Sequence, residues 1–272
     1  MSRLIDFAKI EATGNDFIFV DKRKNKIDEI STDKIISMCD RHLGIGADGV
    51  VITSETPDQM VKMEYFNADG SRGEMCGNAL RATVLFSYML GNIKLNCPLR
   101  LEADDGEHEI LMESSENIQV EIKIKNQLEN VNLLGVNLEN DLSPLGFINT
   151  GVPHLVLLSE SDLNNINVVK IGRELRFHKM FQPAGTNVNF LKINEINQLQ
   201  VRTYERGVEN ETLSCGTGII ASCIAYWNLK GGDVSGISIS TLGGDLSVFY
   251  SNDKLFLKGP ARVAFVGQYS YV

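Results

Sequence analysis

Two cysteines of this 272-residue chain stand in matching phrases, MCGNA at residues 75–79 and SCGTG at residues 214–218. A cysteine thiolate can remove a proton from a carbon atom, and a thiol can return one. Two cysteines on opposite faces of a substrate α-carbon would therefore invert its configuration. Helix starts suit this reaction, because their unpaired N–H groups and dipole stabilise a thiolate and bind a carboxylate. The same groups stabilise a carbanion beside that carboxylate, and the sequence carries no signal for pyridoxal phosphate.

The runs that follow both phrases predict the helices that such a site requires. Residues 79–90 and 218–229 are apolar almost all round, which is typical of helices buried inside a domain. Glycine, a usual helix stop, ends each run. Cys76 and Cys215 are 215 − 76 = 139 residues apart, about half of the chain. We interpret this pattern as an old duplication of one α/β unit, with a cysteine at the start of each central helix.

Short strands separated by polar and glycine-rich turns make up most of the remaining pattern. Strands are predicted over residues 17–20, 49–52, 61–66, 119–124, 154–158, 188–191 and 255–257. A further helix is expected over residues 32–40, with Thr32 as its cap.

The composition of the chain argues against several classes of function and location. Lys and Arg number 26 against 35 Asp and Glu, and the net charge of −9 argues against nucleic acid or an anionic membrane as partner. No apolar run reaches the roughly 18–20 residues of a membrane helix, and Asp6 and Glu11 interrupt the N-terminus as they would not in a signal peptide. A cytoplasmic protein with a small-molecule substrate is expected.

The three other cysteines suggest no further chemistry. The sequence contains no CxxC pair, so no metal site is expected. In a reducing compartment the five cysteines should be thiols. Cys39, Cys97 and Cys223 are expected to be small buried hydrophobic residues.

Six phrases together resemble the diaminopimelate epimerase family, and they occur in the order of that family. They are TGNDF (13–17), DRHLGIGADG (40–49), YFNADGSRGEMCGNALR (65–81), NTGVPH (149–154), GTNVNF (185–190) and RTYERGVENETLSCGTG (202–218). The resemblance implies an α+β fold of two pseudo-symmetric α/β domains, each a curled, mostly antiparallel sheet around a central helix, with the site in the cleft between them. Residues 1–115 and 116–261 would form these domains, and residues 262–272 would return to the first.

The resemblance also implies the site residues. Cys76 and Cys215 would be the catalytic pair, supported by His154 and Glu205. The substrate-binding residues would be Gly77, Asn78, Gly216, Thr217 and Gly218 for the reacting carboxylate, Asn15 with Glu205 for the ammonium group, and Asn67, Asn187 and Arg206 for the distal end. Arginine suits bidentate binding of a carboxylate. Taken alone, His154 reads as a hydrogen-bonded core histidine, and Asn15 and Asn67 as turn residues.

Two positions depart from the family pattern. Ala79 stands where glycine is usual, and Val152 stands where an asparagine usually helps to hold the distal amino-acid end of the substrate. Val152 therefore bears on the identity of the substrate, whereas the two-thiol chemistry does not depend on this position.

The expected function is cofactor-independent and metal-free interconversion of LL- and meso-diaminopimelate. The alternative within the family is a racemase of histidine, glutamate or lysine. Relatives of the proline racemase type would carry histidine at the position of Asn78, so the asparagine argues against that type. A non-catalytic protein in which Cys76 and Cys215 form a redox-switching disulfide is the alternative from another class. The oligomeric state stays open, and a homodimer is compatible with the sequence.

Overall fold

The chain forms two compact units in a computed structural model. The structure describes residues 3–27, 29–73, 75–124, 126–133, 136, 138, 141–231 and 236–271. One unit comprises residues 1–121 with 258–272, and the other comprises residues 122–257. The boundaries expected from the sequence, after residues 115 and 261, differ from these by 121 − 115 = 6 and 261 − 257 = 4 residues.

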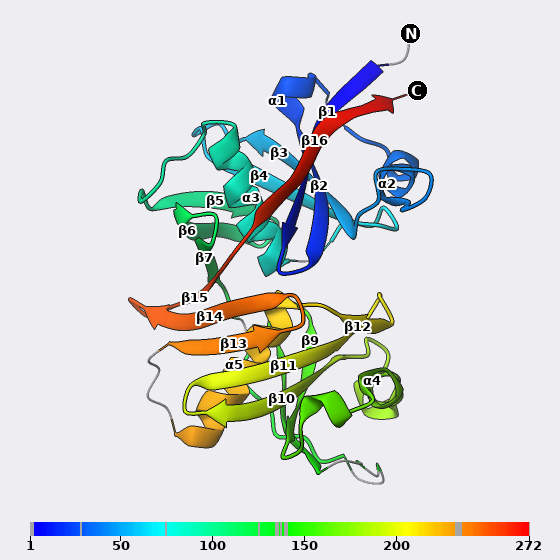
Figure 1. Cartoon of the computed structure of the whole chain (residues 1–272), viewed down its shortest axis with the longest axis vertical. Helices are drawn as coiled ribbons and strands as arrows, with labels where there is room; N and C mark the ends of the chain where they lie inside the picture. The colour runs from blue at the N-terminus through cyan, green and yellow to red at the C-terminus, as the bar shows by residue number, and fades with distance from the viewer. Residues whose placement is uncertain are drawn as a thin grey trace. The chain divides into compact units, whose positions relative to one another are not determined.

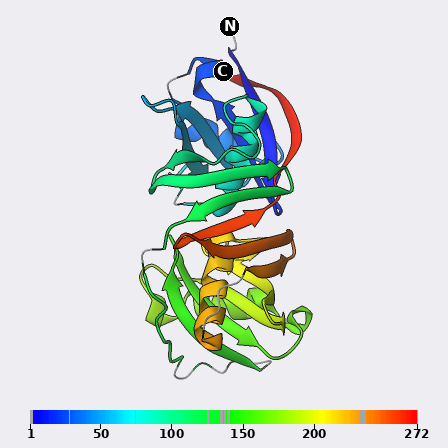
Figure 2. The ribbon, with the colours of Figure 1, turned by 90° about the vertical axis from the view of Figure 1, so that its left-hand side faces the viewer.

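The first unit contains a mixed sheet in the order β16-β1-β2-β3-β4-β5-β6-β7 (Figure 1). Its strands are β1 (Arg3–Ala12), β2 (Asn15–Asp21), β3 (Gly49–Glu55), β4 (Val61–Asn67), β5 (Leu99–Ala103), β6 (Gly106–Ser114), β7 (Asn117–Ile122) and β16 (Arg262–Tyr271). The pairs β2–β3 and β4–β5 are parallel, and the other adjacent pairs are antiparallel. The C-terminal strand β16 lies alongside β1, as Figure 2 shows in red and dark blue.

The second unit repeats this topology in the order β8-β9-β10-β11-β13-β14-β15. Its strands are β8 (Leu142–Asn149), β9 (Pro153–Ser159), β10 (Asn187–Glu195), β11 (Gln198–Glu205), β13 (Ile237–Thr241), β14 (Gly244–Ser251) and β15 (Lys254–Gly259), with β12 (Asn210–Thr212) paired to β11. From β8 to β14 the pairs alternate antiparallel and parallel, as they do from β1 to β6. The predicted α+β fold of two repeated, mostly antiparallel units is confirmed.

Each sheet curls around one central helix. In the first unit α3 (Gly77–Met89) contacts β1, β2, β3, β4 and β6, and in the second α5 (Gly216–Lys230) contacts β8, β9, β10 and β11. Residues 77–87 of α3 are buried without interruption. The glycines that end both helices, Gly91 and Gly231, adopt positive φ angles of 76° and 71°. Both predicted central helices are therefore confirmed, including their stops.

A second helix covers the opposite face of each sheet. Ile18 of β2 packs with Ile35 of α2 (Thr32–Cys39), whereas the neighbouring Phe19 contacts the ring of Phe86 in α3. In the second unit, Leu155 of β9 packs into one cluster with residues of α4 (Val168–Arg176). Because both faces of these strands are buried, they read in the sequence as continuous apolar runs. The remaining helical turns are α1 (Lys22–Asn25), η1 (Leu163–Asn165) and η2 (Lys179–Phe181).

The structure corrects two expectations. Ser31, not Thr32, occupies the cap position of α2, and Thr32 is the first helical residue. Cys97 is exposed between α3 and β5, although it was expected to be buried. Cys39 and Cys223 are buried as predicted, and burial raises the pKa of the Cys39 thiol to about 12 and that of Cys223 well above its usual range. No described helix is long and apolar enough to span a membrane.

Candidate active site

The two cysteines of the matching phrases occupy equivalent positions. Cys76 is the N-cap of α3, with φ −130° and ψ 109°, and Cys215 is the N-cap of α5, with φ −123° and ψ 107°. The carbonyl of each accepts the first helical hydrogen bond, from Leu80 and from Ile219, at 2.9 Å in both helices. The backbone N–H groups of the next residues cannot find partners within the helix. Each thiol is therefore held beside a group of N–H donors at the positive end of a helix.

The first turns of both helices also match in their side chains. Thr83 donates to the carbonyl of Ala79 at 2.7 Å, and Ser222 donates to the carbonyl of Gly218 at 2.8 Å. Thr83 and Ser222 are again 222 − 83 = 139 residues apart. Ala79, the departure noted above, is fully buried in the first turn of its helix.

Asn15 and Asn78 form the surroundings of Cys76 in the first unit. Oδ1 of Asn15 lies 3.8 Å from the Cys76 sulfur and 3.5 Å from Nδ2 of Asn78. The amide of Asn15 is oriented from its other side, because its Nδ2 donates to Asp48 at 2.6 Å. The amide of Asn78 is oriented in the same manner by Arg81, which donates to its Oδ1 at 2.9 Å. The structure thus brings Asn15, Cys76 and Asn78 together.

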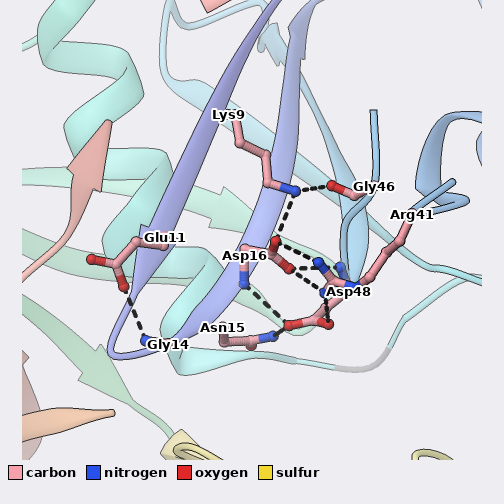
Figure 3. Close-up of polar contacts among 8 residues, drawn as sticks. All are labelled: Lys9, Glu11, Gly14, Asn15, Asp16, Arg41, Gly46 and Asp48. Carbon is pink, nitrogen blue, oxygen red and sulfur yellow. Dashed lines mark hydrogen bonds and ion pairs between the residues drawn. The ribbon is translucent and has the colours of Figure 1, made fainter. Parts of the chain in front are cut away.

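An ionic network holds the strand start that carries Asn15 (Figure 3). Arg41 donates to both oxygens of Asp16 at 3.0 and 2.8 Å and to Asp48 at 2.7 Å. Lys9 is buried, donates to the carbonyl of Gly46 and pairs with Asp16 at 2.8 Å. Burial alone would raise the pKa of Asp16, but the hydrogen bonds and charges of Arg41 and Lys9 lower it to about 2. Asp16 is therefore ionised at neutral pH and ties β1, β2 and the loop before β3 into one structure.

Arg81 is a buried cation in the first unit to which sequence analysis assigned no role. Its side chain is fully buried and donates to Thr13 at 3.0 Å, to Asn78 at 2.9 Å, and to the carbonyls of Gly77 and Pro260 at 3.5 Å. Burial lowers the pKa of Arg81 to about 10, whereas the negative charges of a Cys76 thiolate and of the Glu11 carboxylate act to raise it. Arg81 stays positive at neutral pH, so its field favours the thiolate form of Cys76. Its signal in the sequence is a lone charge within the apolar run 79–90.

His154 and Thr217 form the surroundings of Cys215 in the second unit. Nε2 of His154 lies 2.9 Å from Oγ1 of Thr217, which lies 3.4 Å from the Cys215 sulfur. Asn189 approaches the other ring nitrogen, Nδ1, at 3.0 Å. Burial and the charge of Arg206 lower the pKa of His154 to about 3. His154 is neutral at physiological pH, and Asn189 is a second residue that sequence analysis missed.

Asn187 and Arg206 also lie together in the second unit. Oδ1 of Asn187 accepts a hydrogen bond from the backbone of Arg206 at 2.7 Å, and its Nδ2 donates to the carbonyl of Pro153 at 3.0 Å. The Arg206 guanidinium donates to the carbonyl of Ala184 at 3.2 Å. The half-buried Glu205 precedes Arg206 and ends β11.

Asn67 ends β4, as Glu205 ends β11. Its side chain donates to the hydroxyl of Ser71 at 3.0 Å, and its backbone accepts from Gly70. These contacts are those of a turn residue. Gly77 and Gly216 are the first residues of their helices, and both are buried. In the described part of the chain, no three His, Cys, Asp or Glu side chains are grouped as a metal would require.

The diaminopimelate epimerase family model matches residues 7–125 and 146–264. The two segments begin 146 − 7 = 139 residues apart, the same spacing that separates Cys76 from Cys215. The chain belongs to the diaminopimelate epimerase family. It is an isomerase of the epimerase and racemase type.

Curated relatives carry the likeness over nearly the whole chain. The diaminopimelate epimerase of Aquifex aeolicus is 37% identical over 279 residues, which cover 98% of this chain and 98% of the relative. That of Flavobacterium psychrophilum is 36% identical over 262 residues and covers 94% and 97% of the two chains.

Solved structures share the fold at much lower identity. A PhzF family phenazine biosynthesis protein of Enterococcus faecalis has a TM-score of 0.72 at 15% identity, covering 100% of both chains. A hydroxyproline epimerase of Agrobacterium vitis has a TM-score of 0.71 at 12% identity, covering 98% of this chain and 93% of the other.

Proposed function

We propose that this enzyme interconverts LL- and meso-diaminopimelate, with Cys76 and Cys215 as paired base and acid and with no cofactor. The observation that carries this proposal is the placement of both cysteines as N-caps with the same backbone conformation. The substrate is supported by relatives of 37% and 36% identity that bear the name diaminopimelate epimerase.

The proposed reaction moves one proton on each side of the α-carbon. The thiolate of one cysteine takes the α-proton, so the C–H bond breaks and its electron pair stays on carbon as a carbanion. The thiol of the other cysteine then gives its proton to the opposite face, and its sulfur becomes the thiolate. The two cysteines have exchanged protonation states, and the reverse reaction restores them. Both half-sites must meet one substrate for this to occur.

The helix starts would stabilise the negative charge that forms. Gly77 and Asn78 begin α3, and Gly216, Thr217 and Gly218 begin α5. Their N–H groups are suited to hold the carboxylate beside the reacting carbon and to stabilise the carbanion.

The remaining residues of the family pattern would bind the rest of the substrate and support the thiols. His154 and Glu205 would support the cysteines, and Asn15 with Glu205 would receive the reacting ammonium group. Asn67, Asn187 and Arg206 would bind the distal end. The guanidinium of Arg206 suits a distal carboxylate, because it can donate two parallel hydrogen bonds to it.

A racemase of histidine, glutamate or lysine is the second candidate, and Val152 is the observation that favours it. Valine cannot donate or accept a side-chain hydrogen bond, so this position cannot bind a distal ammonium or carboxylate. A redox switch that joins Cys76 to Cys215 is a third candidate. None of the five cysteines is part of a disulfide in this structure.

Chiral analysis of amino acids incubated with the pure enzyme tests the proposal directly. LL-diaminopimelate should be converted to the meso form without added pyridoxal phosphate and in the presence of EDTA. In D₂O, deuterium should enter at the inverted α-carbon. Inversion without exchange, or faster conversion of histidine, glutamate or lysine, would overturn the mechanism or the substrate respectively. If thiol titration under reducing conditions finds both Cys76 and Cys215 reduced and no amino acid is epimerised, the result would instead support the disulfide switch.

A further inference from the structure

We propose that Asn189 is a positioning residue, which fixes the tautomer of His154 so that the hydroxyl of Thr217 donates to the sulfur of Cys215. The catalytic role of Cys215 rests on the proposed function, but the direction of these hydrogen bonds follows from the second unit alone. No feature of the family resemblance assigned a role to Asn189.

The orientation of the Asn189 amide is set by two neighbours. Nδ2 lies 3.2 Å from the carbonyl oxygen of Leu155, which can only accept a hydrogen bond. Oδ1 accepts a hydrogen bond from the hydroxyl of Thr203 at 3.0 Å. The NH₂ group is therefore the one that faces Nδ1 of His154 at 3.0 Å. Since an amide nitrogen only donates, Nδ1 must accept.

The tautomer of His154 follows from this orientation. A neutral imidazole carries one proton, so an accepting Nδ1 places that proton on Nε2. His154 is fully buried, and Arg206 is the charged group that acts on it. Both effects keep the ring neutral at physiological pH, so a doubly protonated ring does not compete.

The proton on Nε2 sets the direction of the next two hydrogen bonds. Nε2 donates to Oγ1 of Thr217 across 2.9 Å. The hydroxyl oxygen is then an acceptor, and its own hydrogen can point to the Cys215 sulfur, 3.4 Å away. A donor at this position stabilises a thiolate more than a thiol. The chain of hydrogen bonds therefore favours the charged form of Cys215.

The first unit provides an internal comparison. In the parallel ladder of β9 and β10, His154 is the register partner of Asn187, the first residue of β10. In the parallel ladder of β2 and β3, Phe17 is the register partner of Gly49, the first residue of β3, so Phe17 corresponds to His154. In the same register, Asn189 corresponds to Val51. The fold thus accepts apolar residues where the second unit has His154 and Asn189. The polar chain is not a requirement of the sheet.

Gly218 provides the space for this chain of hydrogen bonds. A Cβ at Gly218 would lie 2.3 Å from Oδ1 of Asn189 and 3.3 Å from Cε1 of His154. The equivalent residue of α3 is Ala79, whose methyl group is fully buried. Glycine is needed where the polar pair approaches the helix. At Cys76 the facing group is instead the acceptor Oδ1 of Asn15, 3.8 Å away.

NMR of ¹⁵N-histidine-labelled enzyme tests the tautomer. The chain has four histidines, and a His154→Gln variant assigns the signal of His154. We expect the Nε2–H tautomer at neutral pH in the wild type. Asn189→Leu keeps the side-chain shape but removes the donor, so His154 should no longer show a single tautomer. A wild-type His154 protonated at Nδ1 would overturn the proposal.

The pH profile of Cys215 alkylation tests the effect on the sulfur. Iodoacetamide modification is followed for the Cys215 peptide, with exposed Cys97 as internal control. The midpoint should rise by about 1–2 pH units in Asn189→Leu and Thr217→Val, because a hydrogen bond to a charged group is lost. Thr217→Ser retains the hydroxyl and should keep the wild-type midpoint. The Cys97 midpoint should stay constant throughout.

The outcomes separate this inference from the proposed function. An unchanged Cys215 midpoint in Thr217→Val, or in folded Asn189→Leu, would overturn the inference even if the enzyme epimerises diaminopimelate. The expected shifts in a protein without that activity would sustain the inference and contradict the proposed function. If Asn189→Leu does not fold, the inference is still tested by the tautomer of His154 in the wild type and by the comparison of Thr217→Val with Thr217→Ser.

Discussion

The side-chain amide of Asn15 donates a 2.6 Å hydrogen bond to Oδ2 of Asp48. This bond determines which end of the amide faces Cys76, because the nitrogen is held by the carboxylate and only Oδ1 is left on the other side. Asp48 is in turn held by Arg41 at 2.7 Å and by the backbone N–H of Asp16 at 3.1 Å. A surface ionic network therefore determines the polarity of a group next to a proposed catalytic sulfur.

Replacing Asp48 with alanine should release the amide of Asn15. We expect a rise in KM of about ten- to a hundredfold, because a polar group loses its orientation toward the substrate ammonium group. The measurement is steady-state epimerisation of LL-diaminopimelate. Glu107→Ala is the matched control, since it also removes a carboxylate from an ion pair of the first unit, with Arg100. Equal KM values in the two variants would contradict a role for Asp48 in orienting Asn15.

Replacing either proposed catalytic cysteine with alanine should abolish epimerisation and leave the fold intact. Loss of a general acid or base lowers rates by about 10²–10⁴-fold, and each cysteine would serve one face of the α-carbon. Rates are measured in both directions, and folding is checked by circular dichroism. Cys223→Ala is a matched control, because Cys223 is a buried thiol within α5. Activity above about a tenth of the wild-type rate in Cys76→Ala or Cys215→Ala would refute the two-thiol mechanism.

The buried neutral His154 should make the enzyme sensitive to acid. Its pKa is about 3 in the folded protein and about 6.5 in the unfolded chain. Above pH 6.5 the ring is neutral in both states. Between pH 6.5 and 3 only the unfolded state gains the proton, so the free energy of unfolding should fall by about 1.4 kcal/mol per pH unit from this residue.

Urea denaturation at several pH values measures that slope. His154→Leu should remove this part of the pH dependence, whereas His42→Gln, which changes an exposed side chain, should keep it. A wild-type slope in His154→Leu would mean that other groups account for the acid sensitivity.

Gly218 and Ala79 occupy equivalent positions in α5 and α3, but only the position of Ala79 has room for a methyl group. In Gly218→Ala, the new methyl group must displace Asn189 or His154, at a loss of about 1–3 kcal/mol in stability and at least about tenfold in kcat/KM. In Ala79→Gly, only helix propensity changes, by about 1 kcal/mol, and activity should persist. Thermal unfolding and epimerisation assays of both variants make the comparison. Similar activity in the two variants would show that the space at Gly218 is not needed.

Local patterns in the sequence predict much of this fold. All seven predicted strands coincide with β2, β3, β4, β7, β9, β10 and β15, and all three predicted helices are present. Strands β2, β3, β9 and β15 contain continuous apolar runs that are buried on both faces, whereas apolar and polar residues alternate along β4 and β7. Strands β1 and β11 were not predicted because charged and polar residues interrupt their apolar runs. One of these residues, Lys9, is itself buried and pairs with Asp16.

Helix α4 was missed for a different reason. Gly172 lies within it, and glycine usually argues against a helix interior. In the structure a Cβ at Gly172 would lie 2.4 Å from Tyr204, so glycine allows the helix to approach the sheet. Such a requirement depends on a residue 204 − 172 = 32 positions away, and no local pattern contains it.

The missed site residues share this dependence on distant partners. Arg81 is satisfied by Thr13 and Pro260, far from it in the sequence, and Asn189 acts through His154. The two helix starts at Cys76 and Cys215 could be predicted because a helix boundary depends on local sequence patterns. The roles of Arg81 and Asn189 cannot be predicted from the sequence alone, because their partners come together only in the folded protein.

Val152 provides the sharpest test of the proposed substrate. It lies in the turn between β8 and β9, where its carbonyl accepts from the backbone of Thr150 at 3.1 Å. The missing asparagine amide removes one neutral hydrogen bond, worth about 0.5–1.5 kcal/mol, which is small beside the binding of a distal carboxylate by Arg206. We therefore expect kcat/KM for LL-diaminopimelate to exceed the values for histidine, glutamate and lysine. A higher value for any of those three would identify the enzyme as a racemase of that amino acid.

Two substitutions separate the contributions of Val152 and Arg206. Val152→Asn should raise kcat/KM for LL-diaminopimelate by about two- to tenfold, because it supplies the missing hydrogen bond. Arg206→Ala should lower it by about ten- to a hundredfold, since the distal carboxylate loses a charge-assisted, bidentate partner. For lysine, which has no distal carboxylate, any residual rate should not fall in Arg206→Ala. Arg100→Ala, an exposed arginine paired with Glu107, is the matched control for the lost charge. An unchanged kcat/KM in Arg206→Ala would mean that the enzyme does not bind a distal carboxylate through this residue.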